Sequence, residues 1–284
     1  GDAVLAAAGL WVFAPCLPDF LALRLDEGVI QDTLRLFDAA AAWPDRPAGP
    51  LGVMSISFGS LPAVHLAAAR PEQVRRLLVF GGYADWRAVM RFSVSGGDGV
   101  AYDPLNRPVV FLNLLADLPG APAEPAPLAR AWRAYVEATW GRPEMKAGGA
   151  WQAVARAHAA RLPPALRPLF LQGCGAGPHG SAAVEQALAR GAPRDWLDPR
   201  PAAARVRCPV TLVHGADDDV IPHTELAALA GAFPAAASVQ AWVTGLYGHT
   251  GSAGVDGLRA GLQEARILAR VLGGAMAGNL SVAT

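Results

Sequence analysis

The chain contains almost no lysine and few charged residues of either sign. Lys146 is the only lysine among 284 residues, and charged side chains make up 17% of the sequence. The 24 basic side chains balance 24 acidic ones, so the formal net charge is +0. Binding to nucleic-acid phosphates needs a basic surface, and the composition therefore argues against nucleic-acid binding. We interpret the single lysine as a consequence of an arginine-rich composition and assign it no function.

Cysteine is also scarce. Cys16, Cys174 and Cys208 lie at wide spacings, with no CxxC pair and no histidine at metal-ligand spacing. Structural zinc sites need such clusters, so we expect no metal site. Free cysteines are typical of proteins from reducing compartments, and we expect three unpaired thiols in a cytoplasmic protein.

The sequence lacks an unbroken apolar run of membrane-spanning length. Residues 5–23 are nearly all apolar, but Pro15, Pro18 and Asp19 interrupt them. A spanning helix needs about 20 apolar residues in succession, and proline breaks a helix interior. No positively charged segment precedes the run, as a signal peptide would require. We predict neither a membrane span nor a signal peptide.

Helical and strand-like segments alternate through much of the chain. The apolar patterns predict strands at 10–15, 51–54, 74–80, 210–213 and 238–243. They predict helices at 2–8, 25–43, 58–69, 223–231 and 255–272. Because strands alternate with helices and hairpin signals are missing, we predict an α/β fold with a mostly parallel sheet and helices on both faces.

The alternation stops between residues 84 and 205. Helical segments there are separated by proline-rich breaks such as residues 118–127. Large aromatic side chains recur in these segments at helical spacing: Trp132, Tyr135, Trp140 and Trp151. We predict a core formed by residues 1–83 and 206–284, with residues 84–205 inserted as a helical cap. We expect most of these aromatic side chains to pack the cap rather than to contact a substrate.

One serine lies where an apolar strand turns into a helix. Ser55, Ile56, Ser57, Phe58 and Gly59 form a small-x-Ser-x-Gly pattern directly after a strand-like run. Such a turn holds the serine in a strained backbone conformation. Small residues two positions before and after it let the strand and the helix pass closely. We predict that Ser57 is a nucleophile.

A serine nucleophile needs a base, and the base needs a carboxylate to orient it. In a parallel sheet, functional loops follow the carboxyl ends of the strands. The loop after the fourth predicted strand contains Asp217, Asp218 and Asp219, and the loop after the fifth contains His249. The serine, the acid and the base therefore occur in this order along the chain.

In these three motifs the chain resembles the α/β-hydrolase family, which has a nucleophile elbow, a G-x-x-D loop and a late Gly-His in the same order. The resemblance covers most of the predicted core. Counted from Gly215, it implies that Asp218 is the acid and His249 the base. It also implies that the backbone N–H of Phe58 is one donor of an oxyanion hole.

Other residues remain as alternatives. Asp85 follows the strand at 74–80, a position that carries the acid in some relatives, whereas Asp217 and Asp219 could cap the next turn or face solvent. The remaining histidines have weaker claims to be the base: His65, His158, His179, His214 and His223. Of these, His179 lies in a glycine-rich loop of the predicted cap that could overhang the site.

The second oxyanion donor of the family lies in a loop before the first helix. This chain begins at Gly1, next to the helix predicted at 2–8. We therefore expect the sequence to be a fragment that lacks the first strands and this loop. Loss of one oxyanion donor costs about 100- to 1,000-fold in rate.

The resemblance implies a carboxylic-ester hydrolase that acts on a small or hydrophobic substrate through an acyl-enzyme intermediate, without a metal or organic cofactor. The same three residues also serve acyl transfer, thioester cleavage and amide hydrolysis, and a similar scaffold can bind ligands without catalysis. These activities stay open as alternatives.

Overall fold

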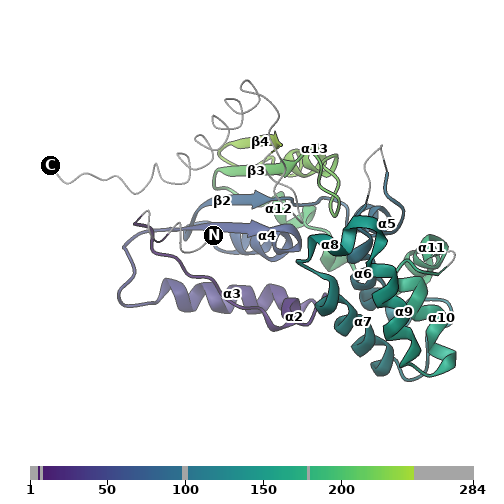
Figure 1. Ribbon diagram of the computed structural model, residues 1–284. Coiled ribbons are helices and arrows are strands. Elements are labelled where there is room, and N and C mark those ends of the chain that lie inside the picture. Colours follow the sequence, from purple (N-terminus) through teal and green to yellow (C-terminus); the bar gives the residue numbers. More distant parts are fainter. Residues whose placement is uncertain (1–5, 7–8, 98–101, 178–179, 246–284) are drawn as a thin grey trace.

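The structure is a computed structural model that describes residues 6, 9–97, 102–177 and 180–245 (Figure 1). Four strands form one parallel sheet in the order of the chain: β1 (Leu51–Ile56), β2 (Val74–Phe80), β3 (Val210–Gly215) and β4 (Val239–Thr244). Each strand lies within a few residues of its predicted position, and the predicted α/β fold is confirmed.

The register of the sheet brings the carboxyl ends of its strands together. Ile56 pairs with Phe80, Phe80 with Val213 and Val213 with Trp242, so these four residues form one row across the sheet. The amide of Gly81, directly after β2, donates to the carbonyl of Val213 over 2.8 Å. The loops that follow the strands therefore all begin at the same end of the sheet, where the carboxyl ends of the strands lie.

The described helices of the core pack on one face of this sheet; helices were predicted on both faces, and the described residues show them on this face only. The core helices are α3 (Gly28–Ala41), α4 (Ser60–Ala69), α12 (Arg200–Ala203) and α13 (Glu225–Gly231). Phe37 of α3, Val64 of α4 and Leu229 of α13 join one hydrophobic cluster with Val79 and Leu212 of the sheet. Helix α4 is apolar all round and lies between α3 and the strands (Figure 1). An all-round apolar helix needs burial on every side, and this position provides it.

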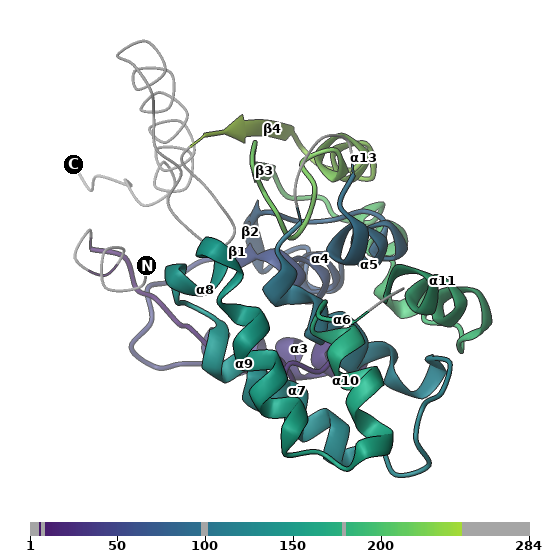
Figure 2. The ribbon, with the colours of Figure 1, turned by 45° about the vertical axis from the view of Figure 1, so that its right-hand side comes forward.

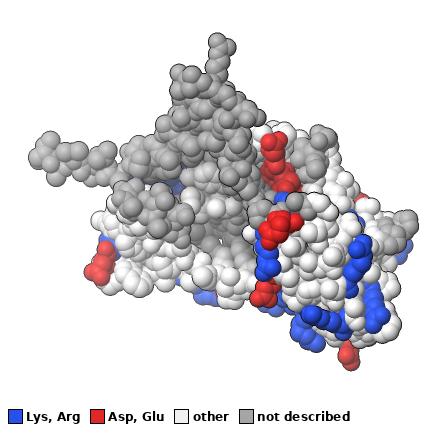
Figure 3. All heavy atoms as spheres, viewed as in Figure 1, with Lys and Arg blue, Asp and Glu red and all other residues white. Residues whose placement is uncertain are grey.

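The described part of residues 84–205 folds into helices, as predicted. The longer ones are α5 (Trp86–Ser95), α6 (Arg107–Leu114), α7 (Ala126–Thr139), α9 (Trp151–Ala160), α10 (Arg167–Gly173) and α11 (Gly180–Arg190). Figures 1 and 2 show these helices gathered beside one end of the sheet. Most charged side chains visible in Figure 3 lie over them, with acidic and basic groups interspersed.

Aromatic side chains fill the interior of this helical segment. Trp132 and Tyr135 are fully buried, as predicted, and Trp132 donates from its indole N–H to the carbonyl of Phe170 over 3.1 Å. Tyr83 and Leu61 of the core belong to the same hydrophobic cluster. The apolar interior is thus continuous between the sheet edge and the helices, while the division into core and cap stays a prediction.

The prediction of a strand at 10–15 is wrong. Residues 10–17 have no regular secondary structure, Phe13 is 38% exposed, and its ring stacks on that of Trp11. The run is short and ends at Pro15, and Pro18 begins the short helix α2 (Pro18–Leu21). A short apolar run forms a strand only where a neighbouring strand accepts its hydrogen bonds, and the sheet pairing of the described residues does not include it.

Other predictions concern residues at the two ends of the chain. The helix predicted at 2–8 lies, except for Ala6, outside the described residues, as does the whole of the helix predicted at 255–272. No helix in the described part of the chain is long and apolar enough to cross a membrane.

A buried carboxylate holds the loop that follows β2. Glu225, the first residue of α13, is 8% exposed, and its Oε2 accepts the backbone N–H groups of Ala84 and Asp85, each over 2.8 Å. A carboxylate that accepts two buried N–H groups forms charge-assisted hydrogen bonds. Glu225 therefore joins the loops after β2 and β3.

Replacement of Glu225 by alanine should destabilise the protein by about 2 to 4 kcal/mol, because two buried N–H groups lose their acceptor. Glu225→Gln keeps an acceptor oxygen and should cost less. Glu137→Ala, on the exposed side of α7, serves as the control and should change stability by less than about 0.5 kcal/mol. Urea denaturation measures all three, and equal effects of the two alanine variants would contradict this role for Glu225.

Candidate active site

Ser57 lies at a sharp turn between β1 and α4. Ile56 has extended backbone angles, Ser57 has a φ of 57°, and residues Ser57–Gly59 form a single 3-10 turn before α4 begins. Among the described residues, only Leu23 and Ser57 have a positive φ without being glycine. This conformation costs a non-glycine residue about 1 to 2 kcal/mol, and such strain is typical of functional sites. The predicted strand–turn–helix geometry around Ser57 is confirmed.

The small residues on either side of Ser57 approach each other. A Cβ atom added to Gly59 would lie 3.8 Å from the Cβ atom of Ser55, an ordinary van der Waals contact. Gly59 has a φ of −59°, so its backbone does not require glycine. The two positions do pass closely, but a Cβ atom at position 59 meets less steric resistance than the sequence pattern suggested.

Ser57 lines a cavity of about 980 Å³ that lies between the carboxyl ends of the strands and the helices. Its apolar wall comes from residues 20–25, from β1 and the turn after it, and from the helical segment: Phe20, Leu23, Leu25, Ile56, Phe58, Met90, Leu105, Val109, Val110 and Trp140. Ligand cavities typically enclose about 300 to 1,000 Å³. The volume and the apolar lining therefore suit a small organic ligand.

Asn113 of α6 fixes one side of this cavity. Its Oδ1 accepts the backbone N–H of Leu25 over 2.7 Å, and its Nδ2 donates to the carbonyls of Leu23 and Val109 over 2.9 and 2.8 Å. The segment with the second strained residue, Leu23, is thereby tied to α6. Its apolar side chains are held in place along the cavity.

Asp218 is completely buried in the loop after β3. Its Oδ1 accepts the backbone N–H groups of Val220 and Ile221 over 3.0 and 2.8 Å, and its Oδ2 lies 3.5 Å from Nε2 of His214. Nε2 of His214 is also 2.8 Å from the carbonyl oxygen of Ile221. These contacts close the loop tightly. Val220 lines the same cavity as Ser57, so the loop reaches the wall next to the serine.

The other candidate acids have different surroundings. Asp217 is exposed, as expected, whereas Asp219 is half-buried and its Oδ2 lies 2.7 Å from Nζ of Lys146. Asp85 caps α5 by accepting the backbone N–H groups of Arg87 and Ala88. Among these aspartates, only Asp218 is completely buried in the loop where the resemblance places the acid.

The predicted base, His249, lies outside the described residues, as does His179. No described histidine lines the cavity. His65 is half-buried on α4, and His158 on α9 packs edge-on against Tyr135; burial lowers the pKa of both imidazoles. These environments are those of packed side chains, so none of the described histidines replaces His249 as a candidate.

Phe58 follows Ser57 at the start of the turn that leads into α4. Backbone N–H groups at the beginning of a helix have no partner within it, and this position could supply a donor to a bound oxyanion. The Phe58 ring packs against Tyr83 with 5.0 Å between the ring centroids. The resemblance predicts a role for the N–H of Phe58, and the sequence did not reveal the contact of its ring with Tyr83.

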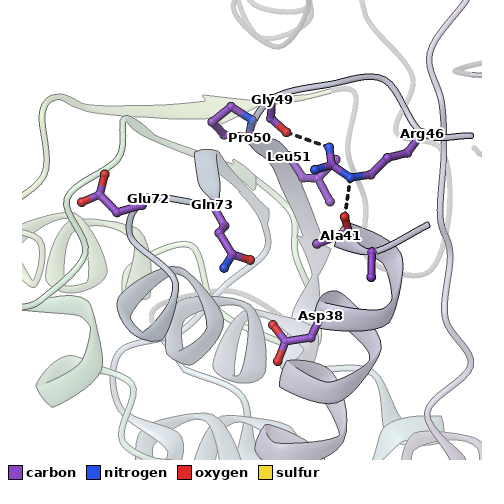
Figure 4. A pocket seen from close by; sticks show the side chains of 9 residues that line it. Asp38, Ala41, Arg46, Gly49, Pro50, Leu51, Glu72 and Gln73 are labelled. Carbon is purple, nitrogen blue, oxygen red and sulfur yellow. Dashed lines mark hydrogen bonds between the residues drawn. The ribbon is translucent and has the colours of Figure 1, made fainter. Parts of the chain in front are cut away.

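A second cavity, of about 600 Å³, lies at the opposite edge of the sheet, near the start of β1 (Figure 4). The guanidinium group of Arg46, which lines this cavity, donates hydrogen bonds to the backbone carbonyls of Ala41, Pro47 and Gly49. These bonds fasten the loop between α3 and β1. Ligand sites of parallel sheets occupy the carboxyl edge, so we regard Arg46 as structural.

No cluster of three or more His, Cys, Asp or Glu side chains in the described part of the chain could hold a metal ion. Cys16, Cys174 and Cys208 are free thiols, and the last two are buried. Burial raises the pKa of the Cys174 thiol well above its ordinary value, which makes it a poor nucleophile.

No family model and no curated protein matches the chain. Similar solved structures include Rv0554 from Mycobacterium tuberculosis, with 18% identity, 88% of this chain and 71% of that chain covered, and a TM-score of 0.40. An enol-lactonase from Burkholderia xenovorans has 15% identity, coverages of 87% and 72%, and a TM-score of 0.37. A serine hydrolase from Cycloclasticus zankles has 13% identity, coverages of 90% and 71%, and a TM-score of 0.39.

These structures have the α/β-hydrolase fold. With identities of 18% or less and TM-scores of 0.40 or less, the likeness does not extend to an activity or a substrate of this chain.

The strain at Ser57 can be measured with two substitutions that both remove its hydroxyl group. Ser57→Gly should be more stable than Ser57→Ala by about 1 kcal/mol, because glycine adopts a positive φ without steric cost. At Ala157, exposed within α9, the order should reverse, since Ala→Gly in a helix costs about 0.5 to 1 kcal/mol. Thermal or urea unfolding gives both differences. The same order at both sites would refute backbone strain at Ser57.

Proposed function

We propose that the chain is a serine hydrolase that cleaves carboxylic esters through an acyl-enzyme intermediate. The observation that carries this proposal is Ser57 itself. It is a strained residue at a strand–helix turn, and it opens into an apolar cavity of about 980 Å³. The buried Asp218 in a loop that reaches the same cavity supports the proposal.

In the proposed reaction, His249 takes the proton of the Ser57 hydroxyl as Oγ attacks the carbonyl carbon of the ester. The tetrahedral oxyanion accepts a hydrogen bond from the N–H of Phe58. When the carbon–oxygen bond to the alcohol breaks, His249 returns the proton to the departing oxygen. Water then attacks the acyl-enzyme with the same base, which releases the carboxylic acid and restores Ser57.

Asp218 orients His249 and stabilises the imidazolium in this scheme. Such an acid must itself be held in a fixed direction. The two N–H bonds to its Oδ1 and the neighbouring His214 provide this support, and the burial of the side chain excludes water from it. The surroundings of Asp218 thus match the demands of the role.

The cavity wall favours an ester with an apolar acyl or alcohol group. Apolar side chains of α5, α6 and residues 20–25 provide most of that wall, and its charged side chains are Arg24, Asp103, Arg142 and Lys146. Each methylene group that moves from water into an apolar cavity contributes about 0.8 kcal/mol to the free energy of binding. Longer acyl chains should therefore be preferred until the cavity is filled.

A fluorophosphonate probe tests the nucleophile. We expect a single covalent label on Ser57 of the 284-residue chain and none on Ser57→Ala. Asp218→Asn should lower kcat for a p-nitrophenyl ester by about 10⁴-fold, as loss of the orienting acid does in related triads. Asp217→Asn, the exposed neighbour, is the matched control and should change kcat by less than about twofold.

A folded chain that binds hydrophobic esters, takes no label and shows no turnover would establish the alternative, a non-catalytic binding protein. Faster transfer of the acyl group to an alcohol than to water would instead assign acyl transfer. Faster turnover of thioesters than of oxygen esters would assign thioester cleavage. Each outcome is read from the same purified protein, whose folding is checked by its thermal transition.

A panel of p-nitrophenyl esters with increasing acyl length tests the cavity. The specificity constant should rise with chain length, and Val109→Phe, which adds a ring to the wall, should move the optimum to shorter chains. The rate of labelling by a small fluorophosphonate should stay the same, because the substitution leaves the elbow intact. Equal specificity constants across the panel would contradict an apolar acyl site.

A further inference from the structure

The single lysine of the chain joins the helical segment to the loop that contains Asp218. Lys146 ends the short helix α8 (Pro143–Lys146). Its Nζ lies 3.0 Å from Oδ2 of Asp103 and 2.7 Å from Oδ2 of Asp219. Asp219 directly follows the proposed catalytic acid in the chain. One ammonium group therefore bridges two carboxylates from segments that are far apart in sequence.

A backbone hydrogen bond reinforces this bridge. The N–H of Asp103 donates to the carbonyl of Asp219 over 2.7 Å, and Oδ1 of Asp103 accepts the N–H of Leu105 over 2.9 Å. The side chain of Asp103 is only 3% exposed. Residues 103 and 219 are thus joined both directly and through Lys146, at a place where Asp103 and Lys146 line the cavity next to Ser57.

The partial burial makes this ion pair different from an ordinary surface pair. Exposed ion pairs contribute little because water screens them. Here Asp103 is buried, and burial raises the pKa of its carboxyl group. Removal of the lysine would leave a buried carboxylate beside a second one, an arrangement that costs far more than the loss of a surface contact. The two segments would then separate, or water would enter between them.

The loop with Asp218 is held from two sides. On its inner side, the N–H groups of Val220 and Ile221 fix the carboxylate of Asp218. On its outer side, Lys146 holds Asp219. We propose that Lys146 is a positioning residue, which clamps the Asp218 loop to the helical segment and so keeps Asp218 in the direction that catalysis requires. This inference rests on the proposed role of Asp218.

A double-mutant cycle in the full chain tests the clamp. Lys146→Met should lower kcat by about tenfold to 100-fold, the effect of a misplacement of about 1 Å in a catalytic group, with KM changed by less than about twofold. Lys146→Arg should recover most of the loss, because a guanidinium can also bridge two carboxylates. Arg130→Met removes an exposed cation from α7 and should leave kcat unchanged.

The cycle separates positioning from a general structural role. In an Asp218→Asn background, Lys146→Met should cause almost no further loss of kcat, because residues that act through one another are not additive. The same fold-loss in both backgrounds, or a loss confined to KM, would overturn the inference. So would a failure of Lys146→Arg to restore kcat in a variant with an unchanged thermal transition.

Failure of the proposed function gives a different result. If Asp218→Asn alone leaves kcat unchanged, the assignment of the acid is wrong, and the clamp loses its target. If Asp218→Asn abolishes turnover while Lys146→Met keeps full kcat, only the clamp is refuted. If the Lys146→Met variant does not fold, Asp219→Asn takes its place in the cycle. Asp219→Asn removes one side of the bridge and should give the same non-additive loss of kcat.

Discussion

The parallel register of the sheet is the constraint on which the candidate site depends. Ile56, Phe80 and Val213 lie in one row, so the chain leaves β1, β2 and β3 at the same edge. A shift of one strand by a single residue would turn its side chains to the opposite face and would displace Ser57 relative to the Asp218 loop. The apolar cluster below the strands fixes this register, because only one alternation buries Val79 and Leu212 together.

Buried carboxylates then hold the loops that the sheet brings together. Glu225 accepts two backbone N–H groups of the loop after β2, and Asp218 accepts two within the loop after β3. Asp103 and Asp219 share Lys146 at the cavity. Few backbone groups of these loops take part in the sheet, so side chains must satisfy them. This explains why the carboxylates of Asp218 and Glu225 are buried among the loops at the carboxyl ends of the strands.

The structure changes the interpretation of two features of the sequence. The single lysine looked like a by-product of composition, yet Lys146 lies between two aspartates beside the proposed acid. The apolar run at 10–15 looked like a strand, yet it is irregular and partly exposed. The contacts of Lys146 and the absence of a strand at 10–15 escaped the sequence analysis for the same reason. The ion-pair partners of a lysine, and the neighbouring strand that a strand needs, lie far away in the sequence. No local sequence pattern shows whether they are present.

The sequence by itself determined the alternation of strands and helices and the turn at Ser57, and it predicts Asp218 as the acid among three aspartates. These features depend on local periodicity, on small residues around one serine and on spacing from Gly215, which the chain carries in short stretches. The tertiary structure alone decided the cavity, the ion pairs of Lys146 with Asp103 and Asp219, and the support of Asp85 by Glu225. Each of these joins residues that are far apart in the chain, and their contacts arise only after the core has packed.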